Sequence, residues 1–248
     1  MRADTIDGVI KALDNIIEEA KGAYSPKGYF PALYRKVTKR VKKGIADGVF
    51  EDALRMKHLD VVFANRYLEA YHNFFEQQAT TESWTIAFSN TARYWPIVLQ
   101  HLLWGMNAHI NLDLGIAAAE IAPGESIHAL KADFDKINEI LAELVEEVEE
   151  ELSEIWPTLK YILAFSGKVD DFLVNFSMRE ARDGAWKFAT ELAFASEEEK
   201  LRLILERDQK IAKFATFINP PGIVPRFIFA VIRLGEKRDI AQVIKTLE

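Results

Sequence analysis

The chain has 248 residues, of which 49% are apolar and 28% are charged, and its formal net charge is −7. This length allows one large or two small globular domains with a substantial core. The acidic balance argues against nucleic acid as a main partner, because binding phosphates requires a basic surface. The absence of cysteine excludes disulfides and fits a reducing compartment. There is no apolar run long enough for a membrane span and no signal peptide pattern, so we expect a cytoplasmic protein.

Nearly every segment places its apolar residues at a helical period, and no segment alternates convincingly as a half-buried strand does. Glycine and proline mark where the helices of the first half stop and start. Gly22 ends the first helix, Pro31 suits the first turn of the second, and Pro96 opens a very apolar one. The pattern predicts helices over residues 4–21, from 31 to between 44 and 48, and over 51–78, 84–88 and 96–121.

In the second half, a long acidic helix begins near Ser126 and must kink or end at Pro157. Ser196, with Glu199 three positions later, has the spacing of a capping box. The expected helices cover residues 126–156, 157–165, 169–176, 178–194 and 196–218, and two short ones follow the loop 219–225. Because no repeat or long polar linker divides the chain, we predict an all-α fold. It is a single-domain multi-helix bundle over residues 1–248, with a buried central helix at about 96–121.

The expected central helix contains two acidic residues and no Lys or Arg. A helix with so few charges is buried on most of its circumference, and each buried polar side chain then needs a partner. At about 100° per residue, two polar stripes lie on roughly opposite sides. They are His109, Asp113 and Glu120 on one side, and Gln100, Asn107 and Asn111 on the other. We expect the amide stripe to face water, which turns the first stripe inward.

His109 and Asp113 are the strongest candidates for chemistry. At this spacing the carboxylate can bond to the imidazole, orient it and raise its pKa. Gly105 lies one turn earlier, where the missing side chain permits close approach of a backbone or ligand. We predict His109 as a catalytic acid or base and Asp113 as its orienting partner. The neighbouring candidate ligand-binding residues are Trp104, Gly105, Asn107 and Asn111. In the alternative interpretation, Asp113 merely satisfies a histidine of the core, or both side chains ligate a metal.

The expected helix at 178–194 brings Arg179, Arg182, Asp183 and Trp186 to one side. Arg182 could stack on Trp186, and Arg179 could pair with Asp183. If this side faces the core, one of the arginines is the natural partner of Asp113 or of an anionic ligand. We predict a catalytic role for Arg182 and ligand binding for Arg179 and Trp186. A surface face of salt bridges is the alternative.

Two Glu-x-x-His spacings, Glu69 to His72 and Glu125 to His128, match half of the ligand pattern of di-iron helical bundles. Such pairs also arise by chance in an acidic chain, and a carboxylate at a helix start is explained by the helix dipole. We therefore assign no metal ligand and leave the cofactor unknown. A metal-dependent helical enzyme, including a di-iron one, is kept as an alternative.

Four blocks occur together in a characteristic order, at residues 58–67, 105–114, 133–138 and 179–186. Together they resemble a bacterial family of about this length, catalogued as a domain of unknown function. The resemblance covers about residues 25–195, and Met-Asn-Ala-His-Ile-Asn-x-Asp-Leu is its most distinctive block. It implies an all-α fold and supplies no activity. It also directs attention to Asp133, which we add to the candidate ligand-binding residues.

The 16 Phe and five Trp residues favour a mostly apolar pocket. The preferred hypothesis is therefore an enzyme with a pocket against the central helix, in which the His109–Asp113 pair acts as acid and base on a small lipophilic or aromatic substrate. One alternative is a non-catalytic protein that binds a small molecule or lipid. Another is a helical interaction protein whose polar core specifies the fold. A small-molecule ligand is the expected partner, and the oligomeric state is left open.

Overall fold

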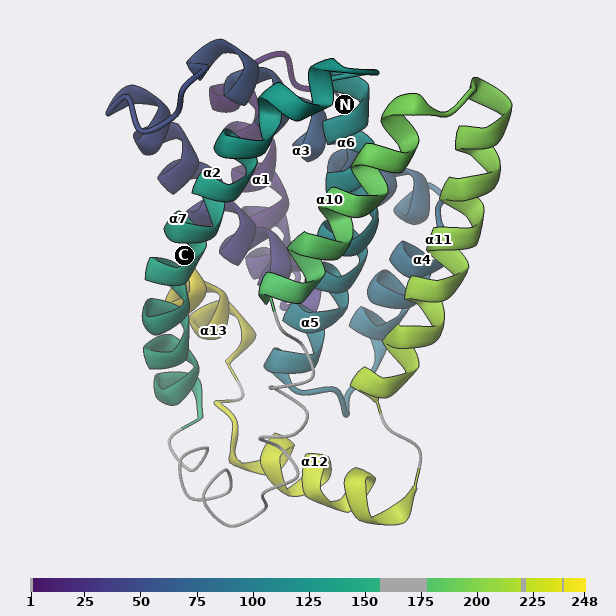
Figure 1. Ribbon diagram of the computed structural model, residues 1–248. Helices are drawn as coiled ribbons and strands as arrows, with labels where there is room; N and C mark the ends of the chain where they lie inside the picture. Colours follow the sequence, from purple (N-terminus) through teal and green to yellow (C-terminus); the bar gives the residue numbers. More distant parts are fainter. Residues whose placement is uncertain (1, 157–177, 220–221, 238) are drawn as a thin grey trace.

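The computed structural model describes residues 2–156, 178–219, 222–237 and 239–248, and the regular structure within these ranges is entirely helical (Figure 1). This confirms the predicted all-α fold. The helices expected at 157–165 and 169–176 lie outside the described residues. None of the described helices combines the length and the apolar character needed to cross a bilayer.

Two helices of the first half begin where a polar side chain satisfies a free backbone N–H. Thr5 accepts a hydrogen bond from the backbone N–H of Gly8, and Asp52 accepts one from that of Arg55. The bounds of the helices in this half agree with the sequence pattern to within a few residues. The helices are α1 (Ile6–Gly22), α2 (Tyr29–Ala46), α3 (Ala53–Phe75) and α4 (Glu82–Ser89).

The central helix is divided by one π-helical turn, in which the N–H of Leu114 bonds to the carbonyl of His109. The segments are α5 (Val98–Ala108), the π turn η3 (His109–Asp113) and α6 (Leu114–Ile121). Because a π turn takes up one residue more than an α turn, the residues after it are displaced by about 100° around the axis. Glu120 is therefore exposed, and the prediction that it faces inward with His109 is wrong.

The amide-bearing side of the central helix is buried against α11 (Glu197–Ile218). Side chains of Gln100, Trp104 and Asn107 donate hydrogen bonds to backbone carbonyls of α11 at 2.7, 3.1 and 3.1 Å. Asn107 is 1% exposed. The prediction that this stripe faces water is therefore wrong, and the central helix is enclosed on both sides.

The remaining helices cover the central one or close the ends of the bundle. They are α7 (Ser126–Ile155), α10 (Met178–Phe194), α12 (Ile223–Gly235) and α13 (Ile240–Leu247). α10 crosses α6 closely, because a Cβ at Gly115 would lie 2.7 Å from the ring of Phe188. α12 lies across one end of the bundle in Figure 1, and α13 packs against α1 and α2. Ser196 caps α11 by accepting from the N–H of Glu199, as the sequence predicts.

Candidate active site

Asp113, at the end of the π turn, accepts hydrogen bonds from three different helical elements. Arg66 Nε of α3 lies 2.8 Å from Oδ1, and Trp84 Nε1 of α4 lies 2.8 Å from Oδ2. His109 Nδ1 lies 3.5 Å from the same Oδ2. Burial by itself would raise the pKa of Asp113, but the charge of Arg66 and the bonds from His109 and Trp84 lower it below its usual value. Asp113 is thus a buried carboxylate. Its arginine partner is Arg66, and the prediction that α10 supplies this arginine is wrong.

His109 is held between aromatic rings. The ring of Phe63 stacks on it at 3.6 Å between centroids and 7° between planes, and Tyr34 meets it edge-on at 4.4 Å. Burial lowers the pKa of His109 by more than Asp113 raises it. The expectation of a raised pKa is therefore wrong, and the imidazole is neutral at neutral pH. Its Nε2 is buried and has no hydrogen-bond partner among the described residues.

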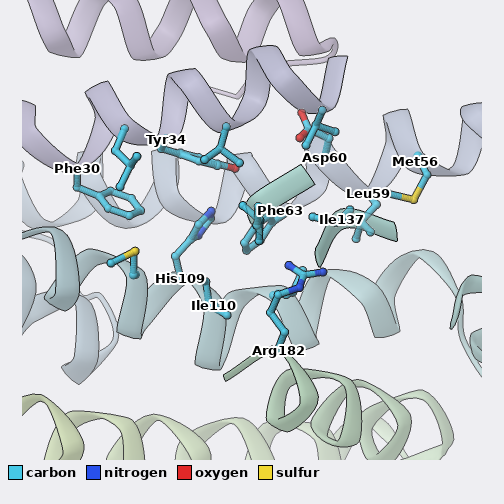
Figure 2. Close-up of a pocket in the computed structure, with 16 residues that line it drawn as sticks. Phe30, Tyr34, Met56, Leu59, Asp60, Phe63, His109, Ile110, Ile137 and Arg182 are labelled. Atoms are coloured by element: carbon cyan, nitrogen blue, oxygen red, sulfur yellow. The ribbon is translucent and has the colours of Figure 1, made fainter. Parts of the chain in front are cut away.

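Nε2 belongs to the wall of a cavity of about 80 Å³, shown in Figure 2. Apolar side chains of α2, α3 and α7 form most of the lining, together with residues of the central helix. Four polar side chains also reach it: Tyr34, Asp60, His109 and Arg182. Tyr34 Oη, Asp60 Oδ2 and Arg182 Nε are, like His109 Nε2, buried without a hydrogen-bond partner in the described part of the chain. Buried polar atoms are nearly always paired, so four orphaned atoms around one cavity indicate a place for a ligand.

Asp60 of α3 is 8% exposed, and burial raises its pKa to about 7. It is therefore partly protonated at neutral pH. No motif in the sequence predicts this residue as part of the site. The available signal was its position within the stripe Met56, Leu59, Asp60 and Phe63, where an acid interrupts an apolar face at helical spacing.

Arg182 of α10 is 4% exposed and lines the same cavity as His109. Its guanidinium lies over the ring of Phe134 at 4.7 Å, and Nη2 donates to the Phe134 carbonyl at 2.9 Å. The expected stacking on Trp186 is wrong. Burial lowers the pKa of Arg182 to about 10, while Asp135 and Asp183 raise it, so the group remains a cation at neutral pH.

Several sequence-predicted residues lie elsewhere in the core. Trp104 and Asn107 bond to α11, and Asn111 Nδ2 donates to Asn107 Oδ1 at 3.0 Å. Gly105 does permit a close approach, but the neighbour is a side chain. A Cβ at this position would lie 2.4 Å from the ring of Phe30.

Two more predicted residues, Asp133 of α7 and Trp186 of α10, do not line the cavity. Asp133 accepts hydrogen bonds from the backbone N–H groups of Glu51 and Asp52, and from Arg55, so it fixes the start of α3. Trp186 packs against Phe134 at 4.9 Å. The side chain of Arg179 lies outside the described part of the structure.

A second, wider space of about 520 Å³ lies beside Asp113, between α3, α4 and α11. Arg66, Trp84 and Asp113 line this cleft, whereas His109 lines the inner cavity. The ion pair of Arg66 with Asp113 and the contact of Asp113 with His109 therefore form a polar connection between the two spaces.

The described residues bring together no group of three or more His, Asp or Glu side chains able to hold a metal. Glu125 and His128 lie 3.7 Å apart and are 88% and 61% exposed at the start of α7. Glu69 is also exposed. These pairs thus lie at the surface, away from the cavity.

The fold and this site define an all-α protein whose buried His–Asp pair adjoins an apolar cavity. The family model described as "Family of unknown function (DUF5995)" matches residues 6–221, and the chain belongs to this family. This confirms the resemblance to a family of unknown function. No match is found among curated proteins or among solved structures.

Proposed function

We propose that the protein is an enzyme that moves protons on a small, largely apolar molecule bound in the cavity. The observation that carries this proposal is the difference between the surroundings of the two ring nitrogens of His109. Its Nδ1 faces the carboxylate of Asp113, while its Nε2 has no hydrogen-bond partner among the described residues and the side chain lines the cavity. A carboxylate at Nδ1 favours the tautomer in which Nε2 carries the free electron pair. Nε2 is therefore available as a general base.

The side chains of the cavity also favour proton transfer over acyl or phosphoryl transfer. The described lining contains no Ser, Thr, Cys or Lys side chain, so the usual activated nucleophiles are not at hand. Isomerisation or elimination requires only a base and an acid. His109 provides the base, and Asp60, with a pKa near 7, provides an acid that still carries a proton at neutral pH.

The size of the cavity limits the substrate. An apolar cavity of about 150 Å³ is known to accommodate benzene, whereas the present cavity holds about 80 Å³. A compact aliphatic substrate therefore fits as the structure stands. An aromatic one requires a side chain such as Phe63, which is partly exposed, to move.

The test uses hydrogen exchange, because it needs no knowledge of the product. Compact molecules that raise the melting temperature are incubated with the protein in D₂O, and deuterium entering carbon-bound positions is followed by NMR. We expect exchange with the wild type and a loss of about 10²–10⁴-fold in His109→Gln. His101→Gln is the matched control, since it alters another buried histidine of the central helix that does not line the cavity. Equal exchange in wild type and His109→Gln would refute the proposal.

A non-catalytic binding protein is the second candidate, and one observation favours it. The 3.5 Å between His109 Nδ1 and Asp113 Oδ2 is longer than a strong charge-assisted hydrogen bond. Catalytic bonds often shorten only when substrate is bound. A ligand that binds at the cavity without any exchange or turnover would favour this second candidate.

A further inference from the structure

Arg182 is a buried cation that forms no salt bridge within the described part of the chain. Its described contacts are with the ring and the carbonyl of Phe134, and it forms no ion pair with a carboxylate of the described chain. Leaving a charge in this state is costly, because burial removes its hydration and the charges of Asp135 and Asp183 offset this only in part. A group kept in such a state is suited to a charge that arrives with a ligand.

The other titratable groups of the cavity leave Arg182 as its main charge. Asp60 is the one carboxylate in the described lining; burial raises its pKa to about 7, so that it is partly protonated at neutral pH, and it forms no ion pair with Arg182. Burial raises the pKa of Tyr34 well above its usual range, so this phenol is neutral. His109 is neutral as well. A small apolar space with one guanidinium in its wall selects a ligand with one negative charge.

We propose that the ligand carries a single carboxylate, which pairs with Arg182, and an apolar body that fills the cavity beside His109. This inference rests on the proposed use of the same site. A carboxylate is favoured over a phosphate because one guanidinium matches its charge and planar geometry, whereas a phosphate dianion calls for further donors. The volume of about 80 Å³ restricts the body to a few carbon atoms.

The position of Phe63 bears on how a ligand reaches both polar groups of the site. Phe63 lies between the His109 ring and the Arg182 guanidinium in the view of Figure 2. It stacks on the imidazole and is itself partly exposed. Because Nε2 accepts a hydrogen bond in the plane of the imidazole, the stacked ring covers one face of His109 without occupying the position of a donor to Nε2.

The test compares short carboxylic acids with their primary amides, which have nearly the same shape but no charge. Acetate, propionate, butyrate and isobutyrate are titrated against the wild type, with calorimetry and the melting temperature as readouts. We expect at least one acid to bind and its amide to bind far more weakly. Arg182→Met should weaken acid binding by about 30-fold or more.

Arg207→Met is the matched control. Arg207 also lies over a phenylalanine ring, that of Phe188, and donates to the carbonyl of Asn111, but it does not line the cavity. This variant should retain the affinity for the acid. Arg182→Lys provides a second variant that keeps the charge without the planar fork. We expect it to bind the acid more weakly while still preferring the acid over the amide, even if Arg182→Met fails to fold.

Three results would overturn the inference: amides that bind as well as acids, unchanged affinity in Arg182→Met, or no binding of any acid in the series. Different results would refute the proposed enzymatic function. If acids bind through Arg182 without deuterium exchange, the carboxylate inference stands and the enzyme proposal falls. If neutral molecules exchange in a manner dependent on His109 while acids do not bind, the reverse holds.

Discussion

The two carboxyl groups near His109 differ in how well they are paired. Asp113 receives hydrogen bonds from Arg66 and Trp84 and is held as the ionised form. One oxygen of Asp60 has no hydrogen-bond partner in the part of the chain that the structure describes, and burial raises the pKa of Asp60 to about 7. Two carboxyl groups in one site with pKa values driven apart are typical of an acid and a base with separate roles.

Asp60→Asn should make the protein more stable, with a pH dependence of defined sign. The pKa of Asp60 rises from 3.8 to about 7 on folding, so between these values the folded chain holds a proton that the unfolded chain has lost. The contribution of Asp60 to stability is therefore largest below about pH 4 and is lost as the pH rises to about 7. Urea denaturation across this range should show that the free energy of unfolding of the wild type falls relative to that of the variant, by a total on the order of 4 kcal/mol. A parallel pH dependence in both proteins would contradict the raised pKa.

The π turn η3 is the element on which the site depends. It occupies His109–Asp113, the same residues that carry the acid–base pair. π turns are rare, cost backbone regularity and occur frequently at functional sites. Here the turn displaces the residues after Asp113 around the helix axis, so that Glu120 is exposed to solvent while Leu114 lines the cavity.

The helix preceding this turn depends on Gly105, because the ring of Phe30 occupies the space of the missing side chain. Gly105→Ala should push Phe30 away and lower the free energy of unfolding by about 1–3 kcal/mol, as overpacked cores do. Gly22→Ala is the control, since a Cβ there would meet no atom within 4 Å. Chemical denaturation of both variants gives the comparison. Equal stability of the Gly105 variant and wild type would show that the contact with Phe30 yields easily.

On the scale of the whole molecule, the site lies between two spaces of different character. The outer cleft of about 520 Å³ reaches Arg66 and Asp113, and the inner cavity of about 80 Å³ reaches His109. α3 supplies Arg66 to the cleft, and Asp60 and Phe63 to the cavity. α3 therefore contributes side chains to both spaces and fixes their positions relative to one another.

Phe63→Ala should enlarge the inner cavity enough for a benzene-sized ligand. The cavity of the wild type has about half the volume of a cavity of roughly 150 Å³ in which benzene is known to bind. We expect benzene to raise the melting temperature of the variant and to leave that of the wild type unchanged. Loss of the stacked ring should itself cost about 3 kcal/mol. Phe75→Ala, on the same helix but 40% exposed, should show no benzene response. A variant of Phe63 that ignores benzene would mean that neighbouring side chains refill the space.

The sequence by itself determined the features that depend on neighbours along the chain. Helical periods, stops such as Gly22 and the Ser196 cap are local, and they predicted the described helices well. The contact of His109 with Asp113 is local too, because residues four apart on a helix are neighbours.

Only the tertiary structure decided which groups meet across helices. It made Arg66 and Trp84 the partners of Asp113, brought Asp60 and Arg182 into the lining of one cavity, and buried the amide stripe against α11. These contacts join residues far apart in the chain, so no period or spacing encodes them. The helical period did not reveal the π turn either, and the displacement that this turn causes is consistent with the exposure of Glu120.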